Sequence, residues 1–177
     1  MKLLIVIDMQ NDFLEGALRN EEGIKIIPNV VNKINNYIKN GDTVIATRDT
    51  HLDNYLDTQE GKRLPVVHCI KDTAGWELNK LISEALGNSL KFDKDGFGSL
   101  ELAAYLSEEY GEEKDLEIEL VGVCTDICVI SNAMLIKAAL REARIIVDAS
   151  CTAGVTAESH NCALNAMRAC QIDIIGD

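Results

Sequence analysis

The run Leu3–Ile7 (LLIVI) is apolar without interruption, and it constrains the fold of this 177-residue chain more than any other segment. A strand with one face in water alternates polar and apolar residues, so an unbroken apolar run is typical of a parallel strand that is covered on both faces. Further strand-like segments alternate along the chain with segments of helical periodicity. We therefore predict a three-layer α/β/α fold, in which a central parallel sheet lies between two layers of helices.

The predicted elements follow one another in regular alternation. Strands are predicted near residues 2–8, 43–47, 65–68, 89–93, 116–122, 144–148 and 172–175. Helices are predicted near residues 28–39, 76–86, 99–110, 126–140 and 156–170, the first with Pro28 near its first turn. The longest loop, residues 49–64, has a length that is common in functional loops. Because no repeat, linker or low-complexity segment interrupts the pattern, we expect one domain over residues 1–177.

The charge and composition of the chain restrict its partners. The formal net charge of −12 argues against a nucleic-acid partner, because phosphate binding needs a basic surface. We expect a cytoplasmic protein without a membrane partner, since no apolar run approaches transmembrane length and no signal peptide is recognisable. The six cysteines are then expected to be reduced thiols. Their spacings include no CxxC pair and match no common structural zinc motif.

The segment GVCTDICV places Cys128 in the first turn of a predicted helix, directly after a buried strand. Thr125 or Asp126 is the expected N-cap of that helix. The helix dipole and the free backbone N–H groups at such a position favour a thiolate and could hold a developing oxyanion. Two interpretations follow: Cys128 is a nucleophile, or it is one more small, buried hydrophobic residue.

Two ionisable side chains are predicted to lie near Cys128. Asp8 ends the first strand, and the active crevice of an open α/β sheet lies at the carboxyl ends of its strands. In the predicted strand LKFDK, Lys94 is in register with the apolar side chains of Leu90 and Phe92, which indicates that it points inward. A carboxylate, an ammonium group and a thiol would together suit nucleophilic catalysis.

Three segments of the chain resemble the isochorismatase-like cysteine hydrolases, and among them the nicotinamidases most closely: IDMQNDF at 7–13, KDGFGSL at 94–100 and GVCTDICV at 122–129. The resemblance covers nearly the whole chain and implies an isochorismatase-like, Rossmann-like fold. It implies a catalytic triad of Asp8, Lys94 and Cys128. It also implies an oxyanion hole formed by the backbone N–H groups of Cys124 and Cys128, with a cis peptide bond between Val123 and Cys124.

A second group of side chains indicates a metal site. Asp49 and His51 follow a predicted strand and are two residues apart, so in an extended chain their side chains leave on the same side, and His68 follows the next apolar run. One carboxylate and two imidazoles suit zinc, manganese or iron. The resemblance implies a divalent metal, in the first place zinc, and puts Glu60 where some nicotinamidases have a further carboxylate ligand. The alternative is that Asp49 pairs with Arg48 at the surface and His51 is an ordinary loop residue.

The expected substrate contacts depart in part from the family pattern. The resemblance makes Phe97 the substrate-facing aromatic residue and puts Leu100 where a second aromatic residue is usual. Phe13 offers another ring that could line the pocket, whereas Trp76 is expected to pack in the core. The residues around His51 also lack the usual aromatic residue and proline.

The residues and the resemblance together predict a cysteine-dependent amidase. Its expected reaction is the hydrolysis of a small amide, nicotinamide to nicotinate and ammonia, through a thioester intermediate. Within the superfamily, the alternative is another small amide, such as a carbamoyl or ureido compound. The alternative of a different class is a non-catalytic protein that binds a small molecule. The resemblance also implies a homo-oligomer.

Overall fold

The computed structural model describes all residues from Met1 to Asp177 and contains one six-stranded sheet whose strands are all parallel. The strands lie side by side in the order β3-β2-β1-β4-β5-β6. Their bounds are β1 Lys2–Ile7, β2 Thr43–Asp49, β3 Leu90–Lys94, β4 Glu117–Val123, β5 Arg144–Ala153 and β6 Asp173–Ile175. The predicted parallel sheet is therefore confirmed.

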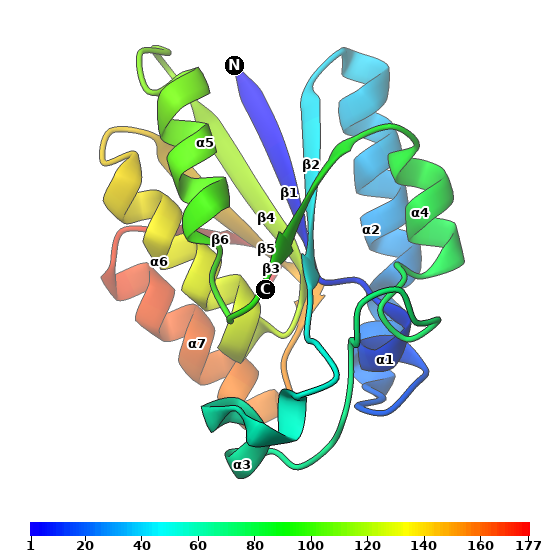
Figure 1. Ribbon diagram of the computed structural model, residues 1–177. Helices are drawn as coiled ribbons and strands as arrows, with labels where there is room; N and C mark the ends of the chain where they lie inside the picture. The colour runs from blue at the N-terminus through cyan, green and yellow to red at the C-terminus, as the bar shows by residue number, and fades with distance from the viewer.

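Helices cover both faces of the sheet, as the three-layer prediction requires (Figure 1). Their bounds are α1 Asn11–Leu14, α2 Glu21–Asn40, α3 Gln59–Arg63, α4 Lys80–Leu86, α5 Leu100–Tyr110, α6 Ile130–Ala139 and α7 Ala157–Ala169. Two short turns complete the set, η1 at Tyr55–Asp57 and η2 at Thr125–Val129, of which η2 is π-helical. Helices α2 and α4 lie on one face, and α5, α6 and α7 lie on the other.

The apolar run of β1 contributes to two separate cores. Leu3, Ile5 and Ile7 pack in the core beneath α5, α6 and α7. Leu4 and Val6 pack in the core beneath α2 and α4. All five side chains are fully buried, which is the reason why this strand tolerates no polar residue on either face.

The predicted strand at 65–68 is absent. Leu64 and Val67 are 39% and 48% exposed, so this apolar run has no core to face. Pro65, within the run, also lacks the N–H group that a strand ladder needs. In place of a strand, the segment forms an irregular connection. Just after it, Ile70 forms an isolated β-bridge with His51, two residues beyond the end of β2.

Several helix boundaries also differ from the prediction. Helix α2 begins at Glu21, not near residue 28, because the Asn20 side chain caps it by accepting a hydrogen bond from the Gly23 N–H. Pro28 therefore lies inside the helix. Helix α4 begins only at Lys80, after a cap from Asn79. The predicted long loop at 49–64 is partly helical, since it contains η1 and α3.

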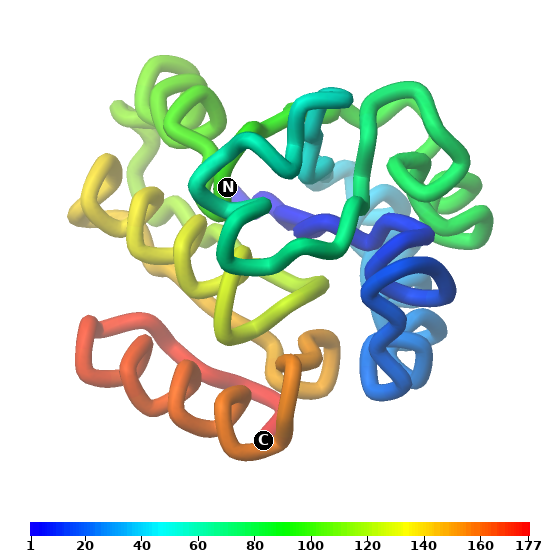
Figure 2. The backbone as a smooth tube through the Cα atoms, turned by 60° about the horizontal axis from the view of Figure 1, so that its bottom comes forward, coloured from blue at the N-terminus to red at the C-terminus, as the bar shows by residue number.

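The order of the strands reverses direction between β1 and β4, and ligands of open α/β sheets bind at such a point. Gly122 of β4 pairs with Ile7 of β1 there. A Cβ atom on Gly122 would lie 2.1 Å from the carbonyl oxygen of Ile7, and its φ is +115°, so only glycine fits this approach. Figure 2 looks toward the carboxyl ends of the strands, across which the segment that follows β2 folds. No helix of the chain combines the length and the apolar character needed to cross a membrane.

Candidate active site

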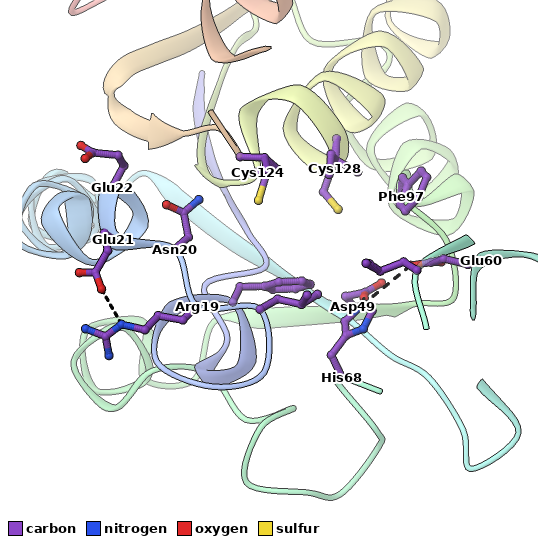
Figure 3. A pocket seen from close by; sticks show the side chains of 15 residues that line it. Arg19, Asn20, Glu21, Glu22, Asp49, Glu60, His68, Phe97, Cys124 and Cys128 are labelled. Atoms are coloured by element: carbon purple, nitrogen blue, oxygen red, sulfur yellow. Dashed lines mark hydrogen bonds and ion pairs between the residues drawn. The ribbon is translucent and has the colours of Figure 1, made fainter. Parts of the chain in front are cut away.

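A cavity of about 560 Å³ opens at the carboxyl ends of β1, β2 and β4. Cys124 and Cys128 line it from one side, and Asp49 and His68 line it from the opposite side (Figure 3). Phe97 lies beside Cys128 at its rim. The cavity thus brings together side chains from segments that are far apart in the sequence.

Lys94 links the other two residues of the predicted triad. Its Nζ atom lies 2.7 Å from Oδ2 of Asp8 and donates a hydrogen bond of 3.6 Å to Sγ of Cys128. All three side chains are buried, and Asp8 adopts a left-handed φ of 49° directly after β1. The Thr47 hydroxyl donates to Oδ1 of Asp8 at 2.7 Å and thereby fixes the carboxylate. The structure therefore brings Asp8, Lys94 and Cys128 together.

Burial governs the protonation of this triad. It raises the pKa of the Cys128 thiol well above its ordinary value, and the charge of Asp8 adds to this effect, while Lys94 opposes it. Burial also raises the pKa of Asp8, again against the opposing charge of Lys94. Burial of the sulfur therefore opposes the thiolate that the helix start alone would favour, so forming the thiolate requires a proton acceptor.

The turn that carries Cys128 differs from the predicted helix start. The N-cap of η2 is Cys124, and neither Thr125 nor Asp126 caps it. Instead, Thr125 pairs with His160 of α7 at 2.8 Å, and the Asp126 carboxylate accepts a hydrogen bond from the Val155 N–H. The peptide bond between Val123 and Cys124 is cis, as the resemblance implies. The N–H of Cys124 has no hydrogen-bond partner and is thus free for a ligand.

Asp49, His51 and His68 converge as the metal prediction requires. Their ligand atoms lie within 4.8 Å of one another, with Oδ2 of Asp49 at 2.9 Å from Nε2 of His51 and 3.5 Å from Nε2 of His68. The buried Nε2 atom of His51 has no hydrogen bond of good geometry. Nδ1 of His68 pairs with the carbonyl oxygen of Val66 at 2.7 Å, which leaves its Nε2 atom as a lone-pair donor. These residues therefore fit a divalent metal ion.

Glu60 lies close to the same three residues. Its Oε1 atom is 3.7 Å from Nε2 of His51 and 3.9 Å from Nε2 of His68. Burial and the neighbouring charge of Asp49 raise the pKa of the Glu60 carboxyl group. Because α3 carries Glu60, this short helix in the predicted loop brings a fourth potential ligand atom, a carboxylate oxygen, to the edge of the cluster.

The three predicted substrate contacts have different positions. Phe13 and Phe97 line the cavity. Leu100 does not: it is the first residue of α5, is 73% exposed and lies outside the cavity lining. Trp76 is buried outside the cavity, where its ring packs against the Arg48 guanidinium group, as expected of a packing residue.

Sequence reasoning assigned no role to two buried amides at the site, Gln10 and Asn132. Gln10 accepts a hydrogen bond from the Asp49 N–H at 2.7 Å and donates to the Asp49 carbonyl oxygen at 2.8 Å, which fixes the backbone of a metal-cluster residue. Gln10 lies within the segment IDMQNDF, so its motif position was a usable signal. Asn132 lies in an apolar helix, and nothing in its sequence context indicated its contacts.

Comparisons with known proteins agree with this fold. The isochorismatase domain family matches residues 2–176. An uncharacterised isochorismatase family protein of Bacillus subtilis is 33% identical over 173 residues, which cover 93% of this chain and 92% of that protein. The nicotinamidase/pyrazinamidase of Mycobacterium tuberculosis is 26% identical, with 99% and 98% covered. The chain belongs to the isochorismatase family.

A solved structure extends the comparison to three dimensions. The crystal structure of Pyrococcus horikoshii pyrazinamidase in complex with zinc matches this chain with a TM-score of 0.80 and 28% identity. The match covers 99% of each chain. The six-stranded parallel sheet and its helical layers are thus those of an isochorismatase-like α/β protein.

Proposed function

We propose that this protein is a cysteine-dependent amidase whose substrate is nicotinamide. Its family and its relatives named nicotinamidase or pyrazinamidase make it an amide-hydrolysing enzyme. The observation that carries the cysteine mechanism is the position of Lys94 between two buried groups, the Asp8 carboxylate at 2.7 Å and the Cys128 sulfur at 3.6 Å. Such a group of acid, base and nucleophile at a cavity suits acyl transfer.

In the first half of the reaction, Asp8 takes the proton of the Cys128 thiol while Lys94 stabilises the negative charge of the pair. The thiolate attacks the amide carbonyl carbon, and the oxygen of the tetrahedral intermediate points at the backbone N–H groups of Cys124 and Cys128. Each oxyanion-hole donor of this kind contributes about 3 kcal/mol to transition-state stabilisation. When the intermediate collapses, Asp8 returns the proton to the leaving nitrogen, and ammonia departs.

In the second half, water hydrolyses the thioester. Asp8, again ionised, accepts a proton from the attacking water, and the thiolate of Cys128 is expelled and reprotonated. Phe13 and Phe97 offer rings against which a flat aromatic substrate packs.

Asp49, His51 and His68 would hold a divalent metal, for which we propose zinc, with Glu60 as a further ligand. Such an ion, when bound, supplies a Lewis acid that coordinates a ring nitrogen or a water at this side of the cavity. The chain itself keeps this cluster in place through Gln10, which holds the Asp49 backbone, and through the Val66 carbonyl, which orients His68.

The test is the release of ammonia from nicotinamide by the purified protein, measured with and without a chelator. The Cys128→Ala variant serves as the blank, and Cys151→Ala, which removes a buried thiol outside the cavity, is the matched control. Release that requires Cys128 but not Cys151 supports the proposal. If nicotinamide yields no ammonia, the assay moves to carbamoyl and ureido compounds, and the nicotinamide assignment is wrong.

A further inference from the structure

Asn132 forms hydrogen bonds in three directions from a fully buried position on α6. Its Nδ2 atom donates to the carbonyl oxygen of Cys128 at 2.8 Å and to that of Phe97 at 3.1 Å. Its Oδ1 atom accepts a hydrogen bond from the Ser99 N–H at 2.9 Å. One carboxamide therefore binds both the turn that carries the nucleophile and the segment that carries a ring of the cavity wall.

The second of these segments, residues 95–99, connects β3 to α5 and is called here the 95–99 loop. Lys94 holds its first half, because Nζ donates to the carbonyl oxygen of Gly96 at 3.0 Å. Its second half ends at Ser99, whose hydroxyl oxygen caps α5 by accepting a hydrogen bond from the Leu102 N–H. Between these two attachments, Phe97 is 48% exposed, and only Asn132 hydrogen-bonds to its carbonyl oxygen.

The 95–99 loop also touches α6 directly. A Cβ atom on Gly98 would lie 2.6 Å from Cδ1 of Leu135, so the loop backbone packs against the helix and a side chain at residue 98 would displace that of Leu135. Because Gly98 and Asn132 both fix the loop to α6, the position of Phe97 is set relative to the helix that follows Cys128. Figure 3 shows the Phe97 ring beside Cys128, at the same side of the cavity.

We infer that Asn132 is a positioning residue that fixes the substrate-facing ring of Phe97 relative to the Cys128 nucleophile. The inference rests on the proposed role of Cys128. A buried amide in this place satisfies two carbonyl groups and one N–H that no other side chain reaches. Shortening the side chain releases the 95–99 loop and lets the substrate sit away from the sulfur.

The experiment uses two variants and one control. Asn132→Ser keeps a hydroxyl that can bond to the Cys128 carbonyl four residues before it but does not reach the 95–99 loop, and Asn132→Ala keeps no side-chain hydrogen bond. Ser131→Ala is the control, because it removes a neighbouring hydrogen bond that does not reach the 95–99 loop, from the Ser131 hydroxyl to the Ile127 carbonyl in η2. Kinetic constants are measured well below the melting temperature of each protein, so that loss of stability alone has no effect on them.

The expected result is a fall in kcat/KM of about a hundredfold in both Asn132 variants, the usual effect of a misplacement of about 1 Å, with most of the change in KM for Asn132→Ser. Ser131→Ala should stay within about twofold of the parent. Unchanged kinetic constants in a folded Asn132→Ser protein would show that the residue only stabilises the fold. If Asn132→Ala does not fold, the kinetic constants of Asn132→Ser alone decide whether Asn132 is a positioning residue.

A second readout keeps this inference separate from the assignment of nicotinamide as substrate. The rate of Cys128 alkylation by iodoacetamide, itself a small amide, is followed by peptide mass spectrometry. We expect this rate to fall by at least about tenfold in Asn132→Ala and to be unchanged in Ser131→Ala. If the parent protein does not hydrolyse nicotinamide, the proposed substrate is wrong, and the alkylation rates still decide the role of Asn132. Equal alkylation rates of Cys128 in the parent and in all variants would overturn the role of Asn132 as a positioning residue.

Discussion

The Nζ atom of Lys94 donates a hydrogen bond of 3.2 Å to Oδ1 of Asp49, so the triad and the metal cluster share one buried contact. The other carboxylate oxygen of Asp49 faces His51 and His68. Burial alone would raise the pKa of Asp49, but its close contacts with these two histidines and the charge of Lys94 outweigh burial and lower it. A substitution in the triad therefore changes the electrostatic environment of the metal cluster, and a substitution in the cluster changes that of the triad.

Lys94→Met should alter the pH dependence of the reaction as well as its rate. Asp8 must be ionised to accept the thiol proton, so activity falls as the pH falls through the raised pKa of Asp8. Lys94 is the charge that lowers this pKa, and without it the acidic limb of the profile of kcat/KM against pH moves to higher pH. The measurement is that profile for both proteins. An acidic limb that stays in place would mean that Asp8 is not the base.

Asp8→Asn should be almost as damaging as Cys128→Ala, because the amide has the same shape but cannot accept the thiol proton. We expect kcat to fall by about 10²- to 10⁴-fold, the usual contribution of a general base. Circular dichroism should show that both variants fold. Mass spectrometry of samples stopped during turnover should find the acyl adduct on Cys128 only in proteins that retain this thiol. Turnover by Cys128→Ala would refute the covalent mechanism.

His51→Ala should reduce the amount of bound divalent metal, because it removes one of three converging ligands. The matched control is His160→Ala, which removes the only histidine outside the cluster. Elemental analysis of the purified proteins, after dialysis against a zinc buffer, gives the metal content of each. We expect close to one metal ion per chain in His160→Ala and a clear deficit in His51→Ala. Equal contents would contradict the ligand assignment.

Lys33→Met should destabilise the fold most at neutral pH. The Lys33 ammonium group lies between the Glu119 and Asp148 carboxylates, both nearly buried, and its removal leaves them unpaired. We expect the free energy of unfolding to fall by roughly 3 kcal/mol at pH 7.

The pH dependence of that loss has a definite sign. Burial would raise the pKa of Asp148, but its hydrogen bonds with Lys33 and Ser150 lower it overall. A carboxyl group with a lowered pKa stabilises the fold above its unfolded-state pKa of about 3.9, and this contribution disappears as the pH falls through the folded-state pKa. Urea unfolding should therefore show the gap between the two proteins narrowing below about pH 4. If the difference in the free energy of unfolding between the two proteins did not depend on pH, lost packing of the Lys33 side chain would be its cause.

The sequence was sufficient to predict the parts of the molecule that depend on local pattern. The unbroken apolar run of β1 predicted a strand buried on both faces, and the rule on carboxyl ends of parallel strands predicted that Asp8 and Cys128 meet. The predicted strand at 65–68 failed because periodicity does not show whether a core exists for an apolar run to face. The cap at Asn20 was missed because Pro28 marked a helix start more strongly than one asparagine does.

Other features of the site depended on contacts between distant segments. Asn132 looks like one polar residue in an apolar helix until the 95–99 loop is placed against it. Likewise, the helix dipole at Cys128 suggested a thiolate, whereas burial of the sulfur, an outcome of tertiary packing, favours the thiol. No local pattern in the sequence contains either fact.

The reversal of strand order between β1 and β4 has a consequence for the protein during its synthesis. In the folded protein one edge of β1 pairs with β2, which is close in the sequence, but its other edge pairs with β4, which begins only at Glu117. Until the ribosome has released β4, that side of β1 presents unpaired backbone groups and apolar side chains to the cell. During synthesis the chain therefore contains Asp8 for a long interval before Cys128 is added. In that interval the unpaired edge of β1 is a surface of the kind that chaperones bind.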